Sequence, residues 1–154
     1  MKHSLKKYWT ESIFLSALQK KSNSEKKMKI AKKLIDWARS QNLNLGETIK
    51  IQSFTPFIGP LGTSRQLFEI KTNGKMWIDF KFIHRYLQFS DSENRQEFIN
   101  RLNQIQGARF SVNAFDDEKN LPFDLDLLVK PENLVEFITF GTWFFDKLRK
   151  GTGS

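Results

Sequence analysis

The sequence predicts an α+β fold: two N-terminal helices, an antiparallel three-stranded β-meander, a capped helix, a short irregular or strand segment, and a C-terminal helix. Apolar residues recur at helical spacing before residue 40 and again after residue 90. Between these regions, apolar and polar residues alternate on either side of glycine-containing turns. Local strands within a helical chain favour an antiparallel sheet covered by helices on one face, rather than a parallel βαβ sheet.

The length and composition predict one soluble domain. A chain of 154 residues, 39% hydrophobic and with 15 Phe, can bury a substantial core. No apolar run reaches the roughly 18 residues that span a bilayer, and no signal-peptide pattern opens the chain. Cysteine is absent, which excludes disulfides and thiol catalysis and fits a cytoplasmic protein. We expect residues 1–150 to form the domain and residues 151–154 to be an expression remnant.

The two predicted N-terminal helices occupy residues 9–21 and 24–42. Ser24 belongs to the residue types that cap helix N-termini, and the Ser22-Asn23-Ser24 sequence separates the two helices. The buried side of the first helix is expected to hold Ile13, Phe14, Ala17 and Leu18. That of the second is expected to hold Met28, Ala31, Leu34, Ile35 and Ala38.

The middle of the sequence predicts three strands. The first lies within TIKIQSFTPFI, residues 48–58, and a glycine-containing loop separates it from a hairpin in QLFEIKTNGKMWIDFKFI, residues 66–83. A three-residue loop ending at Gly74 separates apolar from polar residues better than a two-residue loop, so we expect Lys71 to pair with Lys75. One face then carries Phe68, Ile70, Met76, Ile78 and Phe80. The other carries Leu67, Glu69, Lys71, Trp77, Asp79 and Lys81.

Two further helices are predicted in the C-terminal half. In residues 90–107, Ser90 and Glu93 fit a capping box and Gly107 can close the helix. Residues 108–115 alternate weakly and suit a short strand, and a polar loop follows. The last helix starts at Pro131 and ends before Gly151. The expected core residues of these two helices are Phe98, Ile99, Leu102, Ile105, Leu134, Phe137, Ile138, Phe144, Phe145 and Leu148.

The positive charge is concentrated in the first third of the sequence. Residues 1–50 contain 12 Lys or Arg against 4 Asp or Glu, whereas the remainder contains 13 of each. This asymmetry indicates an anionic partner. Because eleven of the twelve cations are lysines, which lack the planar fork of arginine, we expect contact with the nucleic-acid backbone rather than with bases. The expected contact residues are Lys20, Lys21, Lys26, Lys27, Lys29, Lys32 and Lys33.

The charge pattern predicts a non-catalytic binding or accessory module without a cofactor, and other interpretations remain open. The basic helix can instead dock an acidic protein partner, or it can be an ordinary solvated face. Trp77 and Lys71 on the hairpin are further candidate surface contacts, because an aromatic side chain on a charged sheet face is suited to binding. Competition by duplex DNA would separate a nucleic-acid partner from a protein partner.

The hairpin also carries an acid and lysine set, namely Glu69, Asp79 and Lys81. An acid followed by Asp79-Phe80-Lys81 resembles the catalytic core of the PD-(D/E)XK nucleases, although the Pro-Asp dipeptide is missing and Glu69 replaces the usual first Asp. The resemblance implies that Glu69 and Asp79 hold Mg²⁺ or Mn²⁺, with Lys81 stabilising charge on the phosphate. Alternating acids and lysines are also typical of a solvent-facing strand.

From Phe68 to Phe145 the chain carries a second resemblance, based on four segments of which the last continues to Leu148: TNGKMWIDFKF, RLNQIQG, LPFDLDLL and FGTWFFDKL. In these segments the chain resembles an uncharacterised family of small prokaryotic α+β domains found near restriction or mobile-DNA genes. The resemblance implies a DNA-related role, and it supplies no catalytic residues.

Overall fold

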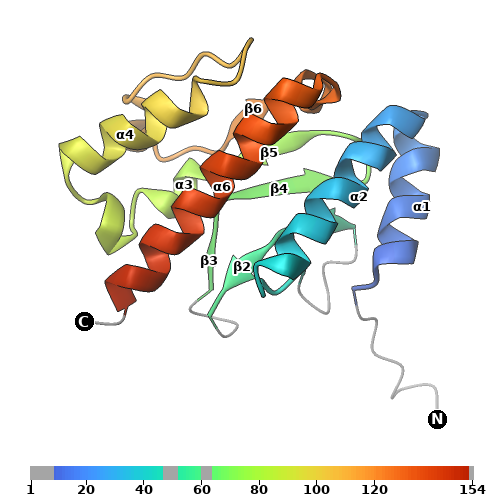
Figure 1. Ribbon diagram of the computed structural model, residues 1–154, viewed down its shortest axis with the longest axis horizontal. Coiled ribbons are helices and arrows are strands. Elements are labelled where there is room, and N and C mark those ends of the chain that lie inside the picture. The colour runs from blue at the N-terminus through green and yellow to red at the C-terminus, as the bar shows by residue number, and fades with distance from the viewer. Residues whose placement is uncertain (1–8, 47–51, 60–63, 153–154) are drawn as a thin grey trace.

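The predicted α+β fold is confirmed by the computed structural model, in which residues 9–46, 52–59 and 64–152 are described (Figure 1). The α-helices are α1 (Glu11–Ser22), α2 (Glu25–Ser40), α3 (Phe80–Ile83), α4 (Ser92–Leu102), α5 (Ala114–Asp117) and α6 (Pro131–Thr152). Two short 3₁₀ helices are η2 (Leu87–Phe89) and η3 (Leu125–Val129). The strands are β1 (Ser53–Phe54), β2 (Phe57–Ile58), β3 (Arg65–Gln66), β4 (Phe68–Lys71), β5 (Met76–Ile78) and β6 (Leu121–Phe123).

The predicted three-stranded meander is present and is extended by a fourth strand. The main sheet has the antiparallel order β1-β4-β5-β6, and β2 pairs with β3 in a separate ribbon. The first part of the first predicted strand, residues 48–51, lies outside the described residues. The described remainder supplies both β1 and β2, which are separated at Pro56. Proline has no N–H with which to continue a ladder.

The short strand expected at residues 108–115 does not form there. The Asn103 side chain donates to the Phe110 carbonyl over 2.8 Å and accepts from the Phe110 N–H over 2.9 Å. These bonds occupy the backbone groups that a neighbouring strand would need. The additional strand is β6 instead, where Phe123 is buried and its ring stacks on the Phe110 ring at 6.3 Å between centroids.

The hairpin has the register predicted from its sequence. The Lys71 N–H donates to the Lys75 carbonyl over 2.8 Å. Gly74 closes the turn with a φ of +86°, which glycine adopts without the steric cost that a Cβ brings. The strands pair as Phe68↔Ile78, Glu69↔Trp77 and Ile70↔Met76. Within the strands, the predicted apolar face is therefore the buried one, at no more than 1% exposure for each of its four residues.

The predicted face assignment is wrong just beyond the strands. β5 ends at Ile78 and the chain turns into α3, so the alternation that would put Asp79 on the polar face stops one residue before it. Asp79 is fully buried, and its N–H donates to the Leu67 carbonyl over 2.9 Å. Leu67 is also buried, because it lies at the break between β3 and β4. Lys81 is exposed, but it lies on α3 rather than on the sheet.

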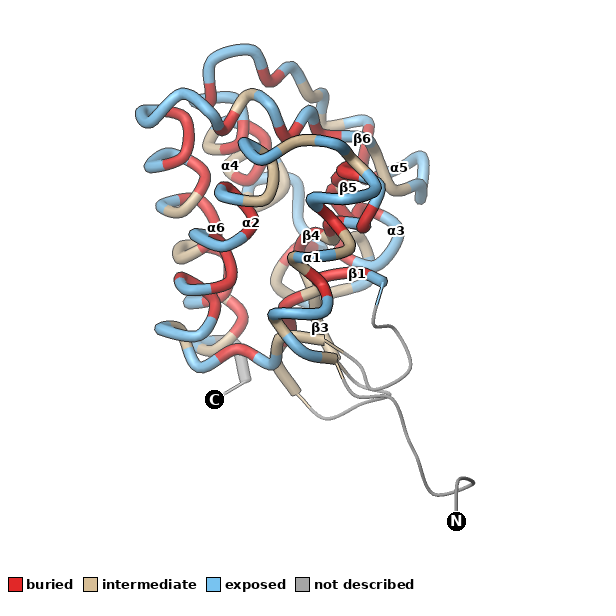
Figure 2. Tube along the Cα trace, turned by 90° about the vertical axis from the view of Figure 1, so that its right-hand side faces the viewer, coloured by how far each residue is buried: buried red, intermediate tan, exposed pale blue. Residues whose placement is uncertain are grey.

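Helices α2 and α6 lie across one face of the sheet (Figure 1), and buried and exposed residues alternate along both, as one-sided packing requires (Figure 2). The two helices approach closely at Gly141, where a Cβ would lie only 2.7 Å from the Trp37 ring. The Trp37 indole N–H donates to the Thr142 hydroxyl over 3.0 Å. The Trp37 ring also stacks on Phe68 of the sheet at 6.5 Å between centroids. Trp37 therefore ties both helices to the sheet.

The helix-end signals are confirmed for α2 and corrected for α4 and α6. The Ser24 hydroxyl accepts from the Lys27 N–H over 3.1 Å, as a helix cap does. At α4 the cap is Asp91, whose carboxylate accepts from the Asn94 N–H over 2.8 Å. Ser90 does not cap, because its hydroxyl binds a carbonyl of the preceding helix η2. The last helix, α6, continues through residue 152, although the sequence predicts that it ends before Gly151.

Most predicted helical core positions are buried, and Ile13 is the clearest exception at 52% exposure. Phe14 and Leu18 are the buried residues of α1. One residue corresponds to about 100° of helix rotation, so Ile13 points away from the side that these two residues share. Ala17, Met28 and Ile138 are half-buried. None of the described helices is long and apolar enough to cross a membrane.

Candidate nucleic-acid interface

The turn between α1 and α2 lies against the tip of the β4-β5 hairpin. A Cβ added at Gly74 would lie 2.9 Å from the Ser22 Cβ, 3.1 Å from the Lys27 Cδ and 3.3 Å from the Lys27 Nζ. The Lys27 side chain therefore extends over the hairpin turn. The fold thus brings together lysines from two distant segments, and we call this surface the basic tip: Lys20, Lys21, Lys26, Lys27, Lys71 and Lys75.

Helix stability explains only some of these lysines. Asn23, in the left-handed region at a φ of +52°, ends α1. Lys20 and Lys21 lie in the last turn of α1, where cations complement the negative end of the helix dipole. Lys26 and Lys27 lie in the first turn of α2, at the positive end of its dipole, where cations are unfavourable. Helix stability therefore does not account for the two lysines of α2.

The seven lysines predicted to contact nucleic acid fall into two groups. Lys32 lies 2.6 Å from Glu11 and 3.0 Å from Asp36, and its hydrogen bond lowers the pKa of Glu11. Lys29 lies 3.4 Å from Glu25. Ion pairs with described residues are absent for Lys20, Lys21, Lys26, Lys27 and Lys33. The uncompensated charge of the two helices therefore lies mainly at the basic tip.

The predicted acid pair, Glu69 and Asp79, is brought together but in unequal surroundings. One carboxyl oxygen of the fully buried Asp79 accepts from the Gln66 amide over 2.6 Å, and the other has no partner among the described residues. Burial raises the pKa of Asp79 well above its ordinary value, and the neighbouring Glu69 raises it further. Glu69 lies 3.3 Å from the Lys71 ammonium. A neutral Asp79 can therefore donate its proton to a hydrogen bond with the Glu69 carboxylate.

Lys81, the third member of the predicted nuclease set, lies apart from this pair on α3. Its N–H donates to the Asn120 side chain over 3.1 Å, and its ammonium lies 6.0 Å from the centre of the Phe82 ring. The lysine beside the acids is Lys71 instead. Within the described ranges, no group of three or more His, Cys, Asp or Glu side chains is arranged to hold a metal ion.

Gln66 and Tyr86, both half-buried, complete a polar cluster around Asp79, and no sequence signal identifies them. The Tyr86 hydroxyl accepts from the Gln66 N–H over 2.8 Å and donates to the Gln66 carbonyl over 3.3 Å. Burial raises the pKa of Tyr86 to about 12, so the hydroxyl stays protonated. Tyr86 thereby holds the β3 backbone in place, and the Gln66 side chain reaches Asp79. Gln66 is 20 residues from Tyr86 and 13 residues from Asp79 in the sequence. Neither separation reflects the periodicity of a helix or a strand, so the sequence pattern does not reveal these contacts.

Trp77 and Lys71 lie on the sheet face opposite the core, as predicted. Trp77 is half-buried and stands between Glu69 and Pro122 on the neighbouring strands. Lys71 is 50% exposed at its side chain, with its ammonium beside Glu69. This face therefore presents an aromatic side chain next to hairpin lysines.

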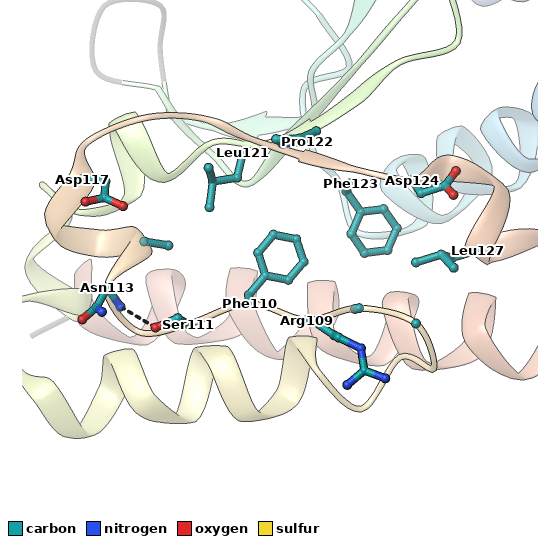
Figure 3. Close-up of a pocket in the computed structure, with 13 residues that line it drawn as sticks. Arg109, Phe110, Ser111, Asn113, Asp117, Leu121, Pro122, Phe123, Asp124 and Leu127 are labelled. Carbon is teal, nitrogen blue, oxygen red and sulfur yellow. Dashed lines mark hydrogen bonds between the residues drawn. The ribbon is translucent and has the colours of Figure 1, made fainter.

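A pocket of about 500 Å³ lies between residues 107–114 and strand β6 (Figure 3). Phe110 and Phe123 point toward one another inside it, with ring planes within 6° of parallel. Asp117 and Asp124 lie toward its opposite ends. No predicted site residue lines this pocket. The weak alternation of residues 108–115 predicts a strand instead, and nothing in the sequence indicates that this segment faces β6 across a pocket.

No family model, curated protein or solved structure matches the chain. The resemblances stated from the sequence therefore stay predictions, and the function has to be argued from the residues of the site.

Proposed function

We propose that this protein is a non-catalytic module that binds the backbone of nucleic acids through the basic tip. The observation that carries the proposal is the position of Lys27 over Gly74, which joins the lysines of the helical turn and of the hairpin in one surface. Lys71 of the basic tip is paired with Glu69. The other five lysines of the tip have no acidic partner among the described residues and are available to neutralise phosphates. The formal charge of +8 favours the same class of partner. We also propose that the protein acts in the cytoplasm, the location expected from its lack of cysteine.

The composition of the basic tip supports contact with phosphates rather than reading of bases. Its members are all lysines, which are flexible point charges and lack the bidentate fork that reads guanine. The N-terminus of α2 adds the positive end of a helix dipole. We therefore expect weak sequence preference and strong salt dependence. If four lysines each neutralise one phosphate of a duplex, log K falls with log salt at a slope of about −3.6.

Fluorescence anisotropy tests this proposal. A labelled duplex is titrated with protein at several salt concentrations, without added divalent metal. The parent should bind at micromolar or tighter concentrations in low salt and lose affinity steeply as salt rises. The variant Lys20→Glu/Lys21→Glu/Lys26→Glu lowers the formal charge from +8 to +2. It should bind more than about tenfold more weakly, with a salt slope shallower by about 3.

A matched variant separates the surface from the net charge. Arg109→Glu/Lys119→Glu/Lys150→Glu has the same formal charge, and its three exposed positions lie outside the basic tip. This control should keep most of the parent's affinity. Equal losses in the two variants would show that net charge, not the basic tip, governs binding. Parental binding by the tip variant would show that the surface is wrongly assigned.

An acidic protein partner would use the same lysines. Unlabelled duplex should compete with such a partner only if both bind at the basic tip, and failure of every nucleic acid to bind at low salt would favour the protein partner. The titration described above therefore comes first.

A metal-dependent nuclease is a second candidate, favoured by the unpartnered buried oxygen of Asp79 beside Glu69. Mg²⁺ or Mn²⁺ could take the place of the proton between these two carboxyl groups. Cleavage of plasmid DNA that requires either metal and is abolished by Asp79→Ala would support this candidate. Cleavage that survives in Asp79→Ala, or its absence in the parent with both metals, would reject it. DNA affinity without metal should be nearly unchanged by the same variant.

A further inference from the structure

Trp77 differs from the other described tryptophans in its surroundings. The indole N–H groups of Trp9 and Trp37 each donate a hydrogen bond, and the Trp143 ring is covered by two cationic side chains. Trp77 makes no ring contact, cation contact or side-chain hydrogen bond with any residue that the structure describes. A half-buried indole on the outer sheet face, without such partners, presents apolar area that a ligand can cover.

The Trp77 side chain shares its face with the hairpin lysines. Lys75 directly precedes β5, and its carbonyl accepts from the Lys71 N–H over 2.8 Å, so the hairpin ladder extends one residue beyond the strand. Side chains two residues apart along such a ladder lie on the same face, which places Lys75 on the face of Trp77. Lys71 pairs with the neighbouring Glu69 carboxylate at 3.3 Å, which offsets negative charge next to the ring. Lys27 continues the positive charge over the turn to α2. The surface thus leads from the lysines of the basic tip to an aromatic ring.

We propose that the ligand of this surface is single-stranded nucleic acid, with one base stacked on Trp77 and the flanking phosphates on Lys71 and Lys75. The inference rests on the proposed function and adds the class of nucleic acid. In a duplex, neighbouring bases cover each base face, so only an unpaired strand offers a face to the indole. Every base has such a face, so stacking adds affinity without a sequence code. A duplex would reach the lysines but not the ring.

The test compares three labelled ligands by anisotropy: oligothymidylate, an abasic oligomer of the same length, and a duplex. Alanine substitution at a stacking aromatic residue typically weakens binding by about 5- to 150-fold per base. Trp77→Ala should weaken oligothymidylate binding by about this factor, and Trp77→Phe should keep most of the affinity. Neither variant should change binding of the abasic oligomer or the duplex. Phe82→Ala, which removes a 37% exposed ring on α3, is the matched control and should bind like the parent.

Each result separates the inference from the proposed function. If Trp77→Ala binds oligothymidylate like the parent, stacking is refuted, while lysine-dependent binding of the duplex would keep the proposed function. If all three ligands are weakened equally, the ring supports the fold and not a base. If nothing binds at low salt, both proposals fail. Tryptophan fluorescence gives a second readout, since quenching by oligothymidylate should occur in the parent and be largely lost in Trp77→Phe.

Discussion

Replacing Asp79 with Asn should stabilise the protein at neutral pH, even though Asp79 is buried and hydrogen-bonded. Asparagine keeps the size of the side chain and an oxygen to accept from the Gln66 amide, which now donates to Asp79 over 2.6 Å. Its NH₂ group supplies a donor at the oxygen position that has no partner, near Glu69. The substitution therefore removes the ability to ionise and leaves the packing nearly unchanged.

The sign of the effect follows from the raised pKa of Asp79. Burial, with Glu69 as the second cause, holds this pKa above its ordinary value of 3.8. The native state therefore keeps a proton that the unfolded chain releases as pH rises. The free energy of unfolding falls with pH from about pH 4 up to the raised pKa, with a limiting slope of about 1.4 kcal/mol per pH unit. The free energy of unfolding of Asp79→Asn lacks this dependence on pH. Between pH 4 and pH 7 the variant therefore gains at most about 4 kcal/mol of stability relative to the parent.

Urea unfolding followed by far-UV circular dichroism from about pH 4 to pH 8 measures this effect. The parent and Asp79→Asn should have similar stability at the acidic end and diverge as pH rises. Asp117→Asn, which changes an exposed carboxylate, should follow the parent at every pH. If the difference between the two proteins does not vary with pH, Asp79 is ionised in the native protein and the argument from burial is wrong. If the difference varies with pH as expected but Asp79→Asn is less stable at pH 7, the asparagine does not replace the hydrogen bonds of Asp79 as argued.

Three further substitutions test the fold. Gly74→Ala places a Cβ at a φ of +86° and 2.9 Å from the Ser22 Cβ, so the urea midpoint should fall by the equivalent of about 1–2 kcal/mol; an unchanged midpoint would contradict the close approach of turn and hairpin. Ser24→Ala removes the cap of α2 and should cost about 1 kcal/mol, which Ser24→Asp should restore. Phe98→Ala removes a ring that meets five other phenylalanine rings and should cost about 3–5 kcal/mol. Its thermal midpoint should fall by roughly 10 °C, and a shift near zero would show that the ring cluster adds little.

The hairpin shows how much of the structure can be predicted from the alternation of apolar and polar residues alone. Its register follows from the sequence because a slip of one residue would move the whole apolar set to the other face. Asp79 lies where this rule stops applying. The alternation holds only while the chain remains a strand, and the position of Asp79 is set by bonds to Leu67 and Gln66 in another segment. Its burial and raised pKa were therefore beyond prediction.

The candidate interface was predictable in composition but not in geometry. The lysines of α2 stand out in the sequence as an excess of positive charge. Which of them are compensated depends on packing, because Glu11 of α1 reaches Lys32 at 2.6 Å only when the two helices lie side by side. The hairpin turn joins the lysines of α1 and α2 only because Gly74 packs against Ser22 and Lys27.

By itself the sequence determined the fold class, the positions of the main helices, the hairpin register and the basic character of the first third of the chain. These properties depend on composition and on periodicity over a few residues, which the chain carries whatever lies next to it. Only the tertiary structure decided that Asp79 is buried, that Lys32 is paired and that Lys27 lies over Gly74. Burial and charge compensation are properties of neighbours in space, and periodicity specifies which side of an element faces the core but not which distant segment meets it.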